Sequence, residues 1–373
     1  LHYPLRRQRQ MCIRDSKNPV EELYQGKKDD YSYHFDGNVF AEVDIWKGLK
    51  FRSSLAYKFF MNDVSTFVPK DMRVYDADGN VLNTMGTNSV NDYHYLSTTY
   101  TNENILTYNV RIGKHEIAAL LGHSVQAWRE DLTNAYKENL STDNLYELDA
   151  ATANPNATGS AAEYALQSFF GRVNYNYDNR YLFEFNIRRD GSSRFAEGNR
   201  WGWFPSFSGA WRITNEDFVL GTAFNEVVTD MKVRGSWGML GNQQIGNDYY
   251  PYINTYATNA KYPFDNKVSG GAVQTENKIQ DISWEKTTTW GAAVDMTLFN
   301  ELQVTLEYYN RKTTGILMQV NVPNTYGYPG YWDNVGAMRN QGLEVSLAWH
   351  KTLGEVQLNF AGNLSLIHIS EPT

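Results

Sequence analysis

The sequence predicts an all-β protein, an antiparallel transmembrane β-barrel of which this chain contributes about twelve strands as an open curved sheet. Polar and apolar residues alternate with a period of two along runs of strand length. Short and long connections alternate between these runs. Aromatic residues are abundant, at 10 Trp, 26 Tyr and 18 Phe among 373 residues. A transmembrane barrel turns the apolar side of such strands toward lipid and the polar side toward a wet interior.

Charge and hydropathy exclude two other classes of protein. The chain has 42 acidic and 34 basic residues and a formal net charge of −8, which argues against a nucleic-acid partner. It has no uninterrupted apolar run of the roughly 18 to 20 residues that a membrane-spanning helix needs. Its single cysteine, Cys12, permits no internal disulfide, so strand pairing alone must hold the sheet together.

The first four strands are expected to form two hairpins. Residues 35–60 predict one hairpin with a very short turn at Lys47-Gly48, and residues 93–112 and 116–128 predict another about Gly113. The apolar faces of these strands include Val39, Val43, Ile45, Phe51, Leu55, Ile117 and Leu121.

Residues 167–213 predict three further strands, with a tight turn at Asp178-Asn179 and a longer polar connection over 191–200. Each strand has one apolar, largely aromatic face. The members of this face include Phe169, Val173, Tyr175, Tyr181, Phe183, Phe185, Trp201, Trp203, Phe207 and Trp211.

Five later strands complete the set, and the connections between strands alternate in length. These strands are expected at 231–240, 284–298, 302–312, 343–349 and 356–360. Polar segments expected as long loops occupy 62–92, 129–163, 241–283 and 313–336. In an antiparallel meander the odd and even connections lie at opposite ends of the sheet. Short turns at one end and long loops at the other are typical of outer-membrane barrels, and only the seventh connection, of roughly fifteen residues, departs from this alternation.

Several blocks of the sequence resemble the SusC/RagA family of TonB-linked outer-membrane proteins. Together they cover nearly the whole chain between its two ends, in the order in which the family has them. The blocks include FFGRVNYNYDNRYLFEFNIRRDGSSRFAEGNRWGWFPSFSGAWRI (169–213), MKVRGSWGMLGNQQIGND (231–248), WEKTTTWGAAVDMTLFN (284–300), LEYYNRKTTGILMQVNVPNTYGY (306–328) and NVGAMRNQGLEVSLAWH (334–350).

The resemblance implies a nutrient importer in the outer membrane of a Bacteroidota-type bacterium. Members of the family import oligosaccharides or peptides, with a SusD-like lipoprotein lidding the barrel and TonB pulling on an internal plug. Their barrels have roughly 22 strands. The plug domain, TonB box, signal peptide and terminal strands of the family are not found here, so the chain is expected to be a fragment incapable of transport by itself.

Both ends of the chain look foreign to the barrel sequence. Residues 1–16 carry arginines without periodicity, and residues 364–373 interrupt a regular strand pattern. Both ends resemble translated sequencing-linker read-through. We therefore expect a partial receptor barrel over 17–363 and non-native segments on either side. Its two unpaired sheet edges are expected to make the isolated chain aggregate.

The strongest block of the resemblance contains RRDGSSRF, and two interpretations of it remain open. Its charged residues could bind a ligand or a plug. Alternatively the segment shapes the exit from strand to loop, with arginine–acid pairs bracing the barrel interior, which is the interpretation we favour. The residues concerned are Arg188, Arg189, Asp190, Ser192, Ser193, Arg194 and Phe195.

Aromatic residues suggest a substrate site, because an aromatic ring fits the apolar face of a sugar. Strand positions such as Trp201, Trp203, Phe204, Trp211 and Trp237 are better explained as a girdle at the membrane boundaries. Substrate contact is therefore expected from loop residues, with loop packing as the alternative. These residues are Tyr249, Tyr250, Tyr252, Tyr326, Tyr328, Tyr331 and Trp332.

No motif of enzymatic chemistry is present, so neither catalytic activity nor a cofactor or metal is predicted. The sequence has no His-Glu-x-x-His, no paired cysteines, no Gly-x-Ser-x-Gly and no phosphate-binding glycine loop. Two other classes remain: a secreted or surface β-rich glycan-binding protein, and a glycan-active β-propeller or sandwich enzyme. In either class the apolar faces would pack inward. A barrel would instead leave bare the set Phe51, Phe183, Phe185, Trp211, Leu306 and Leu347.

Overall fold

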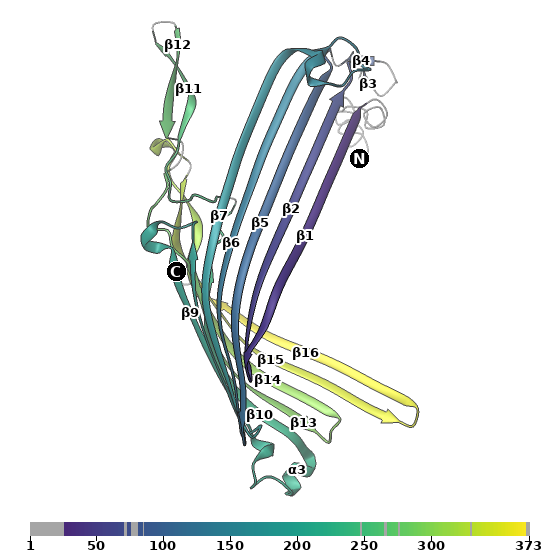
Figure 1. Cartoon of the computed structure of the whole chain (residues 1–373), viewed down its shortest axis with the longest axis vertical. Helices are drawn as coiled ribbons and strands as arrows, with labels where there is room; N and C mark the ends of the chain where they lie inside the picture. The colour runs from purple at the N-terminus through teal and green to yellow at the C-terminus, as the bar shows by residue number, and fades with distance from the viewer. Residues whose placement is uncertain are drawn as a thin grey trace, which may run out of the picture. The chain divides into compact units, whose positions relative to one another are not determined.

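Twelve strands pair side by side in chain order to form one open antiparallel sheet (Figure 1). The computed structural model describes residues 26–70, 73–75, 81–84, 86–246, 248–264, 267–274, 277–328 and 330–370. The strands of this sheet are β1 (Lys27–Trp46), β2 (Leu49–Val68), β5 (Ser89–Ile112), β6 (His115–Leu140), β7 (Ala151–Tyr177), β8 (Tyr181–Ser192), β9 (Trp201–Arg212), β10 (Val228–Asn242), β13 (Glu285–Leu298), β14 (Leu302–Asn321), β15 (Gly330–Leu353) and β16 (Val356–Ser370).

Smaller elements occupy the longer connections. Two separate hairpins are formed by β3 (Arg73–Tyr75) with β4 (Val81–Thr84) and by β11 (Tyr256–Phe264) with β12 (Lys267–Gln274). The short helical elements are η1 (Leu148–Ala150), η2 (Glu197–Asn199), η3 (Ile213–Asn215), α3 (Ala223–Val227) and η4 (Asn324–Tyr326). No helix in these described ranges is both long and apolar enough to cross a membrane.

The tight turns follow from residues that tolerate a positive φ. Asp178 and Asn179 have φ values of 52° and 54°, and the Arg180 amide donates to the Tyr177 carbonyl at 2.8 Å. This geometry is a type I′ turn, whose twist matches that of the paired strands. The same turn recurs at Phe299 and Asn300, with φ values of 56° and 57°.

The pairing register places the apolar residues of neighbouring strands on one face of the sheet, here called the apolar face. Tyr181 of β8 pairs with Trp211 of β9, and Phe185 pairs with Phe207. Both strands present mostly polar or small residues on the opposite side, here called the polar face, where Glu184 pairs with Ser208. Phe204, predicted to belong to the membrane girdle, lies on this polar face instead and is buried in a core. The alternation predicted for this stretch is confirmed.

The apolar face is bare, which contradicts the sandwich and propeller alternatives. The six residues chosen to distinguish these classes have exposed fractions between 37% and 55%. They are Phe51, Phe183, Phe185, Trp211, Leu306 and Leu347. A sandwich would have covered them with a second layer.

The prediction of long loops is wrong for large parts of three of the four segments. Residues 62–68 belong to β2, 129–140 and 151–163 to β6 and β7, and most of 313–336 to β14 and β15. These extensions carry few apolar residues, and those present, such as Phe67, Leu140 and Leu317, do not follow the regular alternation that marks a membrane-facing strand. Backbone pairing with the neighbouring strand is enough to continue them.

The chain packs as two compact units. One contains the described parts of residues 1–38, 56–100 and 127–163, and its core is formed by Phe67, Val90, Leu140 and Ala151. The other contains the described parts of residues 39–55, 101–126 and 164–373. Its core is formed by Phe195, Phe204, Ile245, Ile282, Trp284 and Leu317.

Only part of the two ends expected to be non-native lies among the described residues. Residues 1–16 and 371–373 lie outside the described residues, whereas residues 364–370 continue β16 against β15. The boundaries of the native barrel sequence therefore remain a prediction.

Candidate functional site

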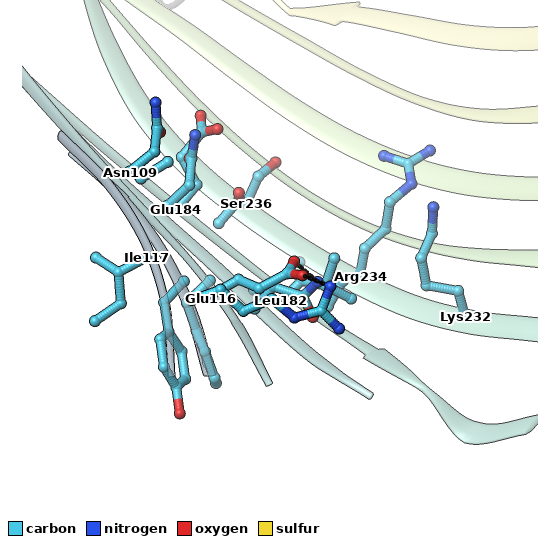
Figure 2. A pocket seen from close by; sticks show the side chains of 18 of the residues that line it. Asn109, Glu116, Ile117, Leu182, Glu184, Lys232, Arg234 and Ser236 are labelled. Atoms are coloured by element: carbon cyan, nitrogen blue, oxygen red, sulfur yellow. Dashed lines mark hydrogen bonds and ion pairs between the residues drawn. The ribbon is translucent and has the colours of Figure 1, made fainter. Parts of the chain in front are cut away.

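A cavity of about 790 Å³ lies within the second unit, near the tight turns of the sheet (Figure 2). Its polar lining comes from several neighbouring strands, because alternate residues of each strand point to the polar face. The side chains that give it hydrogen-bonding capacity include Asn109, Glu116, Asn174, Asn176, Glu184, Ser208, Lys232, Arg234 and Ser236.

A charge network spans three strands at one side of this cavity. Arg234 of β10 donates from Nε to Asp295 at 3.1 Å and from Nη2 to Glu307 at 2.6 Å. Lys232, two residues away on the same strand, forms an ion pair with Asp295 at 3.2 Å. Figure 2 shows both cationic side chains projecting from β10 on the same side. Two cations and two carboxylates balance each other, so the network braces the polar face without giving it a large net charge.

The polar face elsewhere offers amides, carboxylates and hydroxyls. The Asn186 amide donates to Glu184 at 2.8 Å, and the Asn176 amide donates to Glu116 at 3.0 Å. Within the described ranges, no group of His, Cys, Asp or Glu side chains could hold a metal ion. Such a surface can bind polar solutes by hydrogen bonds.

The RRDGSSRF motif begins at the end of β8, where its first charged pair lies on the polar face. Arg188 donates from Nε to both Asp190 oxygens, at 2.7 and 2.8 Å, and from Nη2 to Ser168 at 2.8 Å. Asp190 and Ser168 are buried. This arginine–acid pair is of the kind expected for bracing the barrel interior.

The two serines of the motif hold the exit from strand to loop. The Ser192 hydroxyl accepts from the Arg194 amide at 3.1 Å, and the Ser193 hydroxyl accepts from the Ala165 amide at 2.8 Å. The Ser193 amide donates back to the Ala165 carbonyl at 3.0 Å. These bonds satisfy backbone groups that the end of the strand would otherwise leave unpaired.

Phe195 ends the motif inside a core that joins several loops. It is fully buried, and its ring lies 5.3 Å from that of Trp284, which also contacts Phe204 at 5.3 Å. The Trp284 indole donates to the Arg200 carbonyl at 2.9 Å, and Arg200 donates to the Phe195 carbonyl at 3.2 Å. The motif therefore fixes its own loop to the start of β13.

Arg194 is buried beside a pair of tyrosines. Its guanidinium carbon lies 5.0 Å from the Tyr164 ring centroid and 4.6 Å from that of Tyr249, and the two rings are parallel at 5.9 Å. A guanidinium over aromatic rings is stabilised by cation–π attraction. One of the predicted loop aromatics, Tyr249, is thus part of the motif's packing.

The other loop aromatics lie in different places. Trp332 packs against the Phe195 core, and Tyr250 accepts at its carbonyl from Lys278 at 3.1 Å. Tyr326 is 63% exposed and contacts Tyr328, with ring centroids 6.3 Å apart. Tyr252 is half-buried, and Tyr331 is paired with Val320 in the sheet. Packing thus engages Tyr249 and Trp332, whereas Tyr326 is the most open of the set.

Sequence reasoning missed residues buried inside the segment 241–283. Ile245 and Ile282 are fully buried there, and Lys278 forms an ion pair with Asp248 at 2.9 Å. Isolated isoleucines in an otherwise polar segment were the available signal. The Arg234 network was also missed, although strand alternation places Asp295 and Glu307 on the polar face.

The tight-turn end carries a second charge network. Arg180 contacts Asp217 at 2.7 Å and Glu216 at 3.4 Å, and the Trp211 indole donates to Glu216 at 2.9 Å. Hydrogen bonds from Tyr181 and then Trp211 lower the pKa of the Glu216 carboxyl, and the bond from Arg180 lowers the pKa of Asp217. This network joins the turn after β7 to the connection after β9.

Acid is expected to weaken this network. A carboxyl whose pKa is lowered by folding stabilises the protein fully above its unfolded-state pKa, about 4.3 for Glu, and loses that contribution as the pH falls through its folded value. The urea midpoint should therefore fall below about pH 5 more steeply in the wild type than in Glu216→Gln. Glu226→Gln, which removes an exposed carboxylate from the same connection, is the control. Identical pH profiles for Glu216→Gln and the wild type would contradict the assignment.

A bare apolar face, a polar face lined by hydrogen-bonding groups, and tight turns at one end of the sheet define the class of outer-membrane β-barrels. The family model described as "TonB dependent receptor-like, beta-barrel" matches residues 12–370. The chain therefore belongs to the TonB-dependent receptor β-barrel family, whose members are receptors of the bacterial outer membrane and not enzymes.

Named relatives agree with this family. The chain is 31% identical to TonB-dependent receptor P39 of Formosa agariphila, over 84% of this chain and 29% of the relative. It is 34% identical to TonB-dependent receptor SusC of Bacteroides thetaiotaomicron, over 65% of this chain and 24% of the relative. The solved RagAB peptide transporter matches with a TM-score of 0.80 and 25% identity, over 94% of this chain and 38% of the transporter chain. The chain spans about a third of the length of the first of these relatives.

Proposed function

We propose that this chain is the middle and later part of the barrel of an outer-membrane importer that takes up peptides or oligosaccharides. The observation that carries the proposal is the match of nearly the whole chain to the RagAB peptide transporter. The polar face supports it, because its amides, carboxylates and hydroxyls can exchange hydrogen bonds with backbone amides or sugar hydroxyls during passage. Peptides are the first substrate class by the structural match, and oligosaccharides are the second by the sequence resemblance to the SusC family.

The proposal includes two protein partners. A SusD-like lipoprotein would cover the end of the barrel that carries the longer connections, and TonB would act on a plug in a part of the protein beyond this chain. Within the chain, substrate contact is assigned to the exposed Tyr326 and its half-buried neighbour Tyr328 before the other loop aromatics, because Tyr249 and Trp332 are already engaged in packing.

Uptake by whole cells tests this function. Cells that express the full-length gene should accumulate labelled oligopeptides, and a protonophore or loss of the neighbouring SusD-like gene should abolish the uptake. Tyr326→Ala should raise the half-saturating concentration roughly three- to tenfold, in keeping with about 1 kcal/mol for an aromatic contact. Phe218→Ala, an exposed aromatic in the connection after β9, is the control. Uptake of labelled oligosaccharides alone would select the second substrate class, and uptake insensitive to the protonophore would contradict the proposal.

A further inference from the structure

Arg189 is a charged residue on the apolar face of the sheet. It follows Phe185 and Ile187 on that face of β8, and the register places it between Phe169 of β7 and Trp203 of β9. Its guanidinium carbon lies 4.6 Å from the Trp201 ring centroid and 5.2 Å from that of Trp203. The flat faces of the two indoles therefore hold the cation in a fixed place.

This guanidinium has no anionic partner. Across the described part of the chain, Arg189 forms no ion pair and no side-chain hydrogen bond, and its Nε is buried without an acceptor. The adjacent Arg188 points to the polar face and is paired with Asp190. An unpaired arginine at a membrane-facing surface is unfavourable in free energy. An anion from outside the protein that accepts hydrogen bonds from its N–H groups would remove this penalty.

Arg189 lies at one boundary of the apolar band. Trp201 and Trp203 mark this boundary, and Trp211 and Tyr181 mark the other, with Phe185 and Phe207 paired between them. The ten residue-to-residue steps from Trp201 to Trp211 span about 33 Å along the strand, which at the usual barrel tilt of about 40° is a height of about 25 Å. This is the height of the lipid-facing band of an outer-membrane barrel. Arg189 is therefore level with lipid headgroups, at the end of the sheet that carries the longer connections.

Two further polar side chains, Gln167 and His123, lie on the same face of the neighbouring strands β7 and β6. The Gln167 amide is 3.0 Å from His123 Nε2, and the His123 ring lies 4.8 Å from that of Phe169. Gln167 pairs with Gly191, two residues from Arg189 along β8. Arg189, Gln167 and His123 thus form a polar cluster framed by aromatic rings, here called the Arg189 cluster.

We propose that the Arg189 cluster binds the phosphate group of a lipid headgroup in the outer leaflet. A guanidinium matches two phosphate oxygens with two parallel N–H donors, and Gln167 and His123 add further hydrogen-bonding groups on the same face. Phosphate is the anion that a membrane presents at this depth, and the aromatic frame fits the start of an acyl chain. The assignment rests on the outer-membrane location of the family and is independent of what the protein imports.

The full-length protein in mild detergent can be titrated with phosphatidylglycerol, with uncharged diacylglycerol and with inorganic phosphate, and bound lipid counted by native mass spectrometry. Wild-type protein should retain phosphatidylglycerol in preference to diacylglycerol. Arg189→Gln should weaken phosphatidylglycerol binding roughly tenfold, the loss expected for one charge-assisted contact, and Arg189→Lys should weaken it less. Arg172→Gln removes an exposed arginine from the polar face of β7 and should leave lipid binding unchanged.

Three results would overturn the proposal. Equal retention of both lipids by the wild type would show no headgroup recognition, and this comparison needs no variant to fold. Unchanged phosphatidylglycerol binding in Arg189→Gln would place the lipid elsewhere. Displacement of the lipid by an equal concentration of inorganic phosphate would make the cluster a site for free anions.

Discussion

Replacing Phe195 by alanine is expected to lower the free energy of unfolding by about 3–5 kcal/mol, the usual cost of removing a buried phenylalanine side chain. Among the described residues, Phe195 has the largest of the fully buried side chains, and from the loop between β8 and β9 it contacts Trp284. The cavity left behind cannot close easily, because hydrogen bonds hold its neighbours in position: Arg200 donates to the Phe195 carbonyl, and Trp284 donates to the Arg200 carbonyl. Unfolding by guanidinium chloride, monitored by tryptophan fluorescence, would measure the decrease in the free energy of unfolding.

Phe218→Ala is the matched control for this substitution. Phe218 is 69% exposed in the connection after β9, so its removal should change the free energy by less than about 0.5 kcal/mol. If Phe195→Ala and Phe218→Ala had equal free energies of unfolding, the core around Phe195 would not stabilise the loops that pack in it. The alternative interpretation, in which the charged residues of the motif bind a ligand or a plug, would then be favoured.

Gly48→Ala is expected to destabilise the protein by about 2–4 kcal/mol, since it combines a strained backbone with a steric clash. Gly48 has a φ of +79° in the turn between β1 and β2, and an added Cβ would lie 2.2 Å from the Asn109 carbonyl oxygen. That oxygen belongs to the backbone of β5, where the Asn109 amide bonds to the Gly48 carbonyl at 2.8 Å. Neither group can move without breaking the pairing of β2 with β5.

Gly354→Ala separates the two causes. Gly354 occupies the turn between β15 and β16 with a φ of +64°, and nothing lies within 4 Å of an added Cβ. Only the backbone strain applies there, so the expected loss is about 1 kcal/mol. Equal losses in the two variants, measured by the same titration, would mean that the Asn109 carbonyl gives way to the new methyl group.

The strands and their faces could be predicted because their signals are local. The alternation of Phe183 and Phe185 with Glu184 and Asn186 determines which side chains share a face, whatever the rest of the chain does. Asp178-Asn179 determines a tight turn, because these residues accept a positive φ. The strand extensions beyond the apolar band were missed, since their few apolar side chains, such as Phe67 and Leu317, do not recur with a period of two.

The site was less predictable, because loops are organised by contacts distant in sequence. Strand alternation already places Arg188 and Arg189 on opposite faces of the sheet. Only the fold shows their partners: Arg188 is paired with Asp190, and Arg189 lies over two tryptophans. Tyr249 and Tyr326 looked equivalent in sequence, yet one is stacked beside Arg194 and the other is exposed.

The sequence by itself thus determined an antiparallel sheet with one apolar and one polar face, the positions of its tight turns and its membership of an outer-membrane receptor family. The tertiary structure alone decided which loop residues meet in the Phe195 core, which charges pair across strands, and that the guanidinium of Arg189 lies over two tryptophans. The physical reason is that alternation and turn preference act between near neighbours, whereas burial and charge pairing depend on strands and loops brought together from distant parts of the chain.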